Sequence, residues 1–171
     1  MSADTTLTAE LVDLARRVIE ANRAAGRRIA VAESCTGGLV ATALTEIPGS
    51  SDVFESGFVT YSNEAKMAVL GVASDVIETF GSVSIACAWA MAQGAIAKSE
   101  ADAAVAITGI AGPGGGSELK PVGTVVFACA VRGSDQGDMV ADTRCFGDLG
   151  RGGIRTQAAL CALELLLPDD A

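Results

Sequence analysis

Apolar positions along the chain follow two spacings, one typical of helices and the other of buried strands. Between Leu7 and Ala25 they recur at intervals of three and four residues, which predicts an amphipathic helix that Gly26 ends. The continuous apolar run 103–108 predicts a central strand covered on both faces. The same reading predicts further strands over 28–32, 53–61, 123–131 and 139–146, and further helices over 39–44, 63–70, 84–98 and 152–167.

This alternation of strands and helices predicts an α/β fold, a single layered α/β/α domain over residues 1–171 with a mixed sheet covered by helices. The length suits one domain with a sizeable core, and half of the residues are apolar. The segment 133–137 is predicted to be a hairpin loop. The glycine-rich stretch 112–117 is too short to separate two domains.

Charge and cysteine usage argue against several functional classes. The formal net charge of −9 argues against a nucleic-acid partner, because phosphate contacts need concentrated lysine and arginine. The chain has no histidine and no Cys-x-x-Cys pair, so neither a metal nor a cofactor is predicted, and its five cysteines are typical of reduced, buried thiols. No run is apolar enough to cross a bilayer and no signal-peptide core is present, so we expect a cytoplasmic protein without membrane contact.

One serine stands where a predicted strand turns into a helix, within the run AESCTGG at 32–38. Gly37 and Gly38 allow a tight turn, and the first N–H groups of a helix can stabilise a phosphate or a developing oxyanion. Because the chain lacks imidazole, a nucleophilic Ser34 needs another base, and lysine is the obvious candidate. The alternative is that Ser34 or Thr36 only caps the helix.

Two further loops carry chemically useful groups at predicted strand ends, where ligand sites collect in such sheets. The segment 60–66 delivers Tyr61 and Asn63 just before a helix whose first turn ends at Lys66. The ordinary alternative is a helix cap followed by a solvent-facing lysine. The segment 108–116 is dense in glycine, so its backbone can approach a ligand closely, but it lacks the P-loop Gly-Lys-Ser/Thr. A flexible surface loop is the alternative there.

Five motifs, in their order and spacing, resemble the C-terminal domain family of competence-damage inducible protein A, CinA. They are AESCTGG at 32–38, PGSS at 48–51, VTYSNEAK at 59–66, TGIAGP at 108–113 and KPVGT at 120–124. The resemblance extends over almost the whole chain. It is strongest to the stand-alone members of the family, the PncC-type nicotinamide-nucleotide amidohydrolases.

The resemblance implies an amidohydrolase that converts nicotinamide mononucleotide (NMN) and water to nicotinate mononucleotide and ammonia, in pyridine nucleotide recycling. As a hypothesis, Ser34 attacks the carboxamide carbon, a neutral buried Lys66 accepts the hydroxyl proton, and Tyr61 orients the pair. Hydrolysis of the acyl-enzyme completes the cycle. In the alternative route Lys66 activates water and Ser34 only binds the amide. Cys35 is an alternative nucleophile if its thiol faces the pocket, and otherwise a buried structural thiol.

Substrate contacts are expected from the loops around this pair. Backbone N–H groups near Thr36 and Gly37 would meet the oxyanion, and the 108–116 loop with Arg151 or Arg155 would hold the phosphate. The predicted substrate-binding residues are Thr36, Gly37, Gly38, Asn63, Thr108, Gly109, Gly112, Arg151 and Arg155. The family's usual Gly-Asp-Arg is replaced here by GDLGR at 147–151, so for both arginines a surface position at the start of the helix stays open.

The resemblance also implies a homodimer that acts on a small-molecule nucleotide. Two other functions stay open at this point. A non-catalytic nucleotide- or phosphate-binding module would keep the glycine loops and arginines but would not need Lys66. A serine-lysine hydrolase of another amide would use the same pair but would leave the glycine-rich loop without a phosphate to bind.

Overall fold

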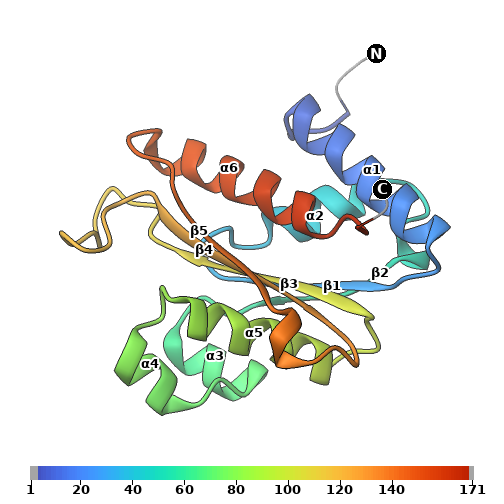
Figure 1. Ribbon diagram of the computed structural model, residues 1–171. Helices are drawn as coiled ribbons and strands as arrows, with labels where there is room; N and C mark the ends of the chain where they lie inside the picture. The colour runs from blue at the N-terminus through green and yellow to red at the C-terminus, as the bar shows by residue number, and fades with distance from the viewer. Residues whose placement is uncertain (1–3, 170–171) are drawn as a thin grey trace.

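The computed structural model describes residues 4–169, which contain a five-stranded mixed sheet (Figure 1). The strands are β1 (Ile29–Glu33), β2 (Phe54–Val59), β3 (Ala103–Gly109), β4 (Thr124–Val131) and β5 (Val140–Cys145). Their spatial order is β2-β1-β3-β4-β5. β1 pairs in parallel with β2 and β3, whereas β4 is antiparallel to β3 and β5. The predicted mixed α/β sheet is confirmed.

Helices cover both faces of this sheet, as the layered α/β/α prediction requires (Figure 1). One face carries α1 (Ala9–Ala24), α2 (Leu39–Thr45) and α6 (Gly150–Leu165), and the other carries α3 (Asn63–Leu70), α4 (Ser74–Phe80) and α5 (Ile85–Ala97). Two short 3-10 turns, η1 (Ser50–Asp52) and η2 (Gln136–Asp138), precede β2 and β5. Within the described residues, no helix has both the length and the apolar character that a membrane span needs.

Alternating side chains of the central strands separate two apolar clusters. On β1, Ile29 and Val31 join the cluster under α1, α2 and α6, while Ala30 and Ala32 join the cluster under α3 and α5. The strand residues facing α5 are mostly alanines, as in the stretch 103–106 of β3, where Ala104 and Ala106 face that side. Small side chains let α5 approach the sheet closely.

The parallel strands β1, β2 and β3 all end at one edge of the sheet, and this edge carries the candidate site. Backbone hydrogen bonds to neighbouring strands fix the first residues of the loops after β1 and β2. The Ser34 N–H donates to the Ile107 carbonyl and the Thr60 N–H to the Glu33 carbonyl, both at 2.9 Å. α6 begins at the same edge, because Arg151 in its first turn reaches the carbonyl of Gly112. Chain segments distant in sequence therefore converge where ligand sites form in such sheets.

Candidate active site

Ser34 and Lys66 meet at this edge although 32 positions separate them in sequence. The Lys66 Nζ lies 2.9 Å from the Ser34 Oγ and donates a second hydrogen bond of 2.9 Å to the Thr60 carbonyl. Both side chains are buried, with exposed fractions of 1% for Lys66 and 7% for Ser34. The structure thus brings together the two side chains proposed from sequence as nucleophile and base.

The start of α3 directs Lys66 inward. Ser62 is the N-cap of this helix, because its Oγ accepts the Ala65 N–H at 3.0 Å, and its carbonyl accepts the Lys66 N–H at 3.1 Å. Among residues 4–169 no carboxylate forms an ion pair with Lys66. Burial lowers the pKa of Lys66 from its usual 10.5, and the opposing contributions from Cys87 and Cys35 are smaller. A lysine with a lowered pKa is neutral over a wider pH range and can accept a hydroxyl proton.

Glu33, the residue before Ser34, holds the start of α2. Its carboxylate is fully buried and accepts the N–H groups of Val40 and Ala41, each at 3.0 Å. The Thr36 carbonyl accepts the Leu39 N–H. Three of the four N–H groups at this helix start, those of residues 39–41, therefore already have acceptors within the chain, which leaves only the Gly38 N–H for the oxyanion or phosphate expected there.

Arg155 of α6 supports the same loop and does not line the cavity. Its Nε donates to the Cys35 carbonyl at 3.1 Å and its Nη2 to the Thr36 carbonyl at 3.0 Å. The Gly37 N–H donates to the Ser34 carbonyl, so it too is occupied. These bonds shape the nucleophile loop. Four residues predicted to bind substrate do not line the cavity, and their contact with substrate stays a prediction: Thr36, Gly37, Gly38 and Arg155.

A cavity of about 480 Å³ opens beside Ser34 and Lys66. Its walls come from the ends of β1 and β3, the start of α3, the link between α4 and α5, and the glycine-rich loop after β3. The predicted site residues that line it are Ser34, Tyr61, Asn63, Lys66, Thr108, Gly109, Gly112 and Arg151. Among the described residues no aspartate or glutamate lines it, although the chain has 21 of them. An acidic protein thus offers a locally cationic cavity.

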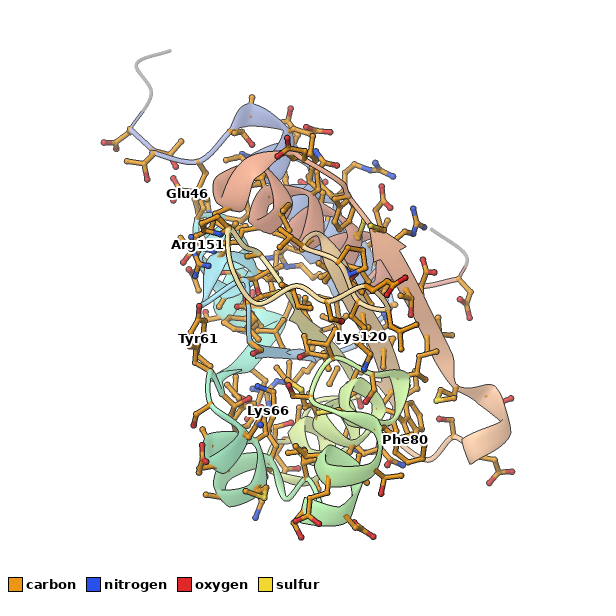
Figure 2. All side chains as sticks on the ribbon, turned by 90° about the vertical axis from the view of Figure 1, so that its left-hand side faces the viewer. Glu46, Tyr61, Lys66, Phe80, Lys120 and Arg151 are labelled. Atoms are coloured by element: carbon orange, nitrogen blue, oxygen red, sulfur yellow. The ribbon has the colours of Figure 1, made fainter. Side chains whose placement is uncertain are left out.

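The Tyr61 hydroxyl faces Arg151 and not the buried pair. It accepts a hydrogen bond of 2.7 Å from Arg151 Nη2, while Nη1 donates to the Gly112 carbonyl at 2.8 Å. Tyr61 is 59% exposed, and Figure 2 shows it beside Arg151, apart from Lys66. Among the described residues, no hydrogen bond joins Tyr61 to Ser34 or Lys66, so its predicted role in orienting the pair stays a prediction. The Thr60 carbonyl is the group that fixes the Lys66 amine.

The sequence marks Lys120 as one of four basic residues with an unusual neighbourhood, but the predicted site residues include neither it nor the link between α4 and α5. Lys120 lines the cavity, and so do residues 81–83, which link α4 to α5. The Lys120 Nζ donates to the Phe80 carbonyl at 3.0 Å, and the Thr108 Oγ1 donates to the Ser82 carbonyl at 2.8 Å. The KPVGT motif was a usable signal for Lys120, whereas nothing in the residues of the link indicated a site.

Cys35 lines the cavity but is only 5% exposed. Burial raises the pKa of its thiol to about 11. The thiol is therefore protonated at neutral pH and a poor nucleophile, which favours the interpretation of Cys35 as a buried structural thiol.

Comparison with known proteins places this geometry in a family. The model of the CinA C-terminal domain matches residues 11–168. The nicotinamide-nucleotide amidohydrolase PncC of Escherichia coli K12 is 49% identical over 158 residues, which are 92% of this chain and 93% of that protein. A putative competence-damage inducible protein of Symbiobacterium thermophilum is 50% identical over 147 residues, and the match spans 82% of this chain but 34% of that longer protein.

Solved structures agree with the sequence matches. The crystal structure of competence/damage inducible protein CihA from Agrobacterium tumefaciens superposes with a TM-score of 0.90 at 48% identity, covering 95% of this chain and 96% of that one. A CinA superfamily protein from Escherichia coli superposes with a TM-score of 0.85 at 32% identity. The family model, the sequence identities and the shared fold agree, and the chain belongs to the CinA C-terminal domain family.

Proposed function

We propose that the protein is a nicotinamide-nucleotide amidase, which hydrolyses the carboxamide of NMN to nicotinate mononucleotide and ammonia in pyridine nucleotide recycling. The observation that carries the proposal is the buried 2.9 Å contact between Lys66 Nζ and Ser34 Oγ at the wall of a cationic cavity. The name of the E. coli relative, matched over 92% of this chain, supports the choice of substrate.

In the proposed mechanism, Ser34 Oγ attacks the carboxamide carbon while the neutral Lys66 amine accepts the hydroxyl proton. The new C–O bond pushes the carbonyl electron pair onto oxygen. Collapse of this intermediate breaks the C–N bond, and Lys66 returns its proton to the departing ammonia. Water then attacks the acyl-enzyme, again with Lys66 as base, and nicotinate mononucleotide leaves as Ser34 regains its proton.

The backbone N–H of Cys35 is the proposed oxyanion donor. It directly follows the nucleophile, its residue lines the cavity, and within residues 4–169 it has no backbone acceptor. Arg155 holds the Cys35 and Thr36 carbonyls, which keeps this part of the loop fixed. A preorganised donor of this kind contributes about 3 to 4 kcal/mol to transition-state stabilisation.

The proposal also retains two expectations from the family resemblance. The first is a homodimer, and the second is a cytoplasmic location. The exposed apolar side chains Met139 and Val140 at edge strand β5 are compatible with a second copy pairing there.

Ammonia release from NMN tests the proposal directly. We expect turnover by the wild type and at least about a thousandfold loss of kcat in Ser34→Ala and in Lys66→Met, because the two residues act as a unit. Lys98→Met, which removes the same charge from the exposed end of α5, serves as the control that keeps activity. Circular dichroism checks that each variant is folded.

Three results would contradict the proposal or its mechanism. Wild-type binding of NMN without ammonia release would indicate a binding module. Equal turnover of unphosphorylated amides would indicate a serine-lysine hydrolase of another substrate. Substantial activity in Ser34→Ala would favour direct activation of water by Lys66.

A further inference from the structure

Two cations stand on opposite sides of the cavity. Figure 2 shows Lys120 across from Arg151 and Tyr61, with Lys66 below them. The Lys66 amine is buried and bonded to Ser34 and Thr60, so Lys120 and Arg151 are the more accessible cations of the cavity lining. A phosphorylated substrate therefore has two candidate anchors, and their surroundings differ.

The backbone that presents Lys120 is fixed on both sides. The Ser117 N–H donates to the Lys120 carbonyl at 2.9 Å, and the Lys120 N–H donates back to the Ser117 Oγ at 3.1 Å. Just beyond, the Pro121 carbonyl accepts the Thr124 hydroxyl at 2.6 Å. These hydrogen bonds before and after Lys120 fix its backbone on the cavity wall. Less conformational entropy of the loop is therefore lost when Lys120 binds a ligand.

The Lys120 ammonium is left with unused hydrogen-bonding capacity. Its Nζ crosses to the Phe80 carbonyl at 3.0 Å, and a Cβ built on Gly81 would lie 3.3 Å from it, so the charge rests on the link between α4 and α5. An ammonium has three N–H donors, and this one bond uses one of them. No carboxylate among the described cavity residues neutralises the charge.

The groups around this ammonium also favour an anion. Ser82 follows Gly81 directly, Ser117 bonds to the backbone of Lys120, and both line the cavity. A phosphate placed here would meet an ammonium and two hydroxyl groups.

Arg151 is placed differently. Two of its five N–H donors bind the Gly112 carbonyl and the Tyr61 hydroxyl, which fixes the guanidinium between the loops after β2 and β3 and the start of α6, whereas a single contact holds the Lys120 ammonium. We infer that Lys120 binds the 5′-phosphate and makes the enzyme select the mononucleotide over the dephosphorylated riboside. This inference rests on the proposed amidase function and names the specificity-determining residue within it.

Steady-state kinetics with NMN and with nicotinamide riboside test the inference. In Lys120→Met we expect KM for NMN to rise at least about tenfold, because a charge-assisted hydrogen bond is lost, with kcat within about twofold of the wild type. The low kcat/KM for the riboside should not change, because the riboside has no phosphate. Lys120→Arg should recover part of the affinity for NMN, and Lys98→Met should behave as the wild type.

Two kinetic outcomes would overturn the inference. Equal losses for NMN and the riboside in Lys120→Met would mean that Lys120 only supports the cavity wall through the Phe80 carbonyl. Unchanged kinetics with NMN would mean that the phosphate binds elsewhere.

A wild type that releases no ammonia from NMN would refute the amidase and not the phosphate site. The site is then tested by calorimetric titration of inorganic phosphate and of ribose 5-phosphate into wild type and Lys120→Met. Binding lost in the variant supports the assignment, whereas equal binding, or none to either protein, overturns it.

Discussion

At the scale of single residues, Lys66 is the position where stability and chemistry oppose each other. An ammonium removed from water without a carboxylate partner is unfavourable, and the folded protein responds by lowering the pKa of Lys66 from 10.5. The same shift favours the neutral amine that the proposed mechanism needs. A structural role alone would be served better by an apolar side chain of similar length, so a buried lysine beside a serine indicates catalysis.

The lowered pKa of Lys66 predicts a pH dependence of stability with a definite sign. Between its folded pKa and 10.5, the unfolded chain binds more protons than the folded one, so the free energy of unfolding rises with pH. Lys66→Met should remove a contribution to this slope of up to about 1.4 kcal/mol per pH unit, whereas Lys98→Met should leave it. Urea denaturation at several pH values up to about 10 measures the difference, because the contributions of the thiols are common to all three proteins.

Identical slopes in wild type and Lys66→Met would show that Lys66 keeps its charge in the folded protein across that range. The activity offers an independent check, because the same titration should appear as the acid limb of the kcat/KM profile for NMN.

The sequence predicted single residues correctly where the absence of histidine limited the possible bases. It failed where a side chain bonds to groups far away in the sequence. The absence of histidine led from Ser34 to lysine, and the strand-to-helix motifs led to Lys66. The hydrogen bonds of Arg155 were not predicted, because its acceptors, the Cys35 and Thr36 carbonyls, lie about 120 positions earlier in the chain. Periodicity carries no information about such contacts.

At the scale of elements, the contact between α3 and α5 sets the position of Lys66. Gly94 of α5 lies against the backbone of Leu70 at the end of α3, and a Cβ at this glycine would overlap the Leu70 carbonyl. Lys66 lies one turn before Leu70 on the same helix. The lack of a side chain at Gly94 therefore lets α3 dock where its lysine reaches Ser34.

Gly94→Ala should destabilise the protein by about 1 to 3 kcal/mol, because two packed helices would have to separate. Gly152→Ala in the first turn of α6 is the matched control, since nothing lies within 4 Å of a Cβ built there and its φ is not positive. That control should gain up to about 1 kcal/mol from helix propensity. Urea denaturation of both variants gives the comparison, and equal stabilities would contradict the close approach of α3 and α5.

Strands and helices with a strong apolar pattern were predicted from the sequence, whereas helix α4, which lacks such a pattern, was not. All five strands lie close to their predicted ranges, because continuous or alternating apolar runs identify buried strands. α4 was not predicted, since its seven residues include none that is fully buried and so show no apolar stripe. The cavity wall that α4 and its link to α5 provide was missed for the same reason.

At the scale of the whole molecule, a single sheet joins two apolar clusters that lie on opposite faces. Cys35 belongs to the cluster under α1, α2 and α6, and Cys87 to the cluster under α3 and α5. Both thiols are buried, and burial raises the pKa of each. The reactivity of each thiol therefore measures when the apolar cluster that contains it becomes exposed to solvent.

We expect the two thiols to become reactive in one common transition. Neighbouring residues of β1 and β3 point into opposite clusters, so neither cluster can be exposed without disrupting strands that the other needs. Pulsed alkylation across a urea series, read by mass spectrometry, should give the same midpoint for Cys35 and Cys87, with the exposed Cys145 modified already in the native protein. An earlier midpoint for Cys87 would show that α3 and α5 detach as a separate unit, which would uncouple Lys66 from Ser34 before the sheet unfolds.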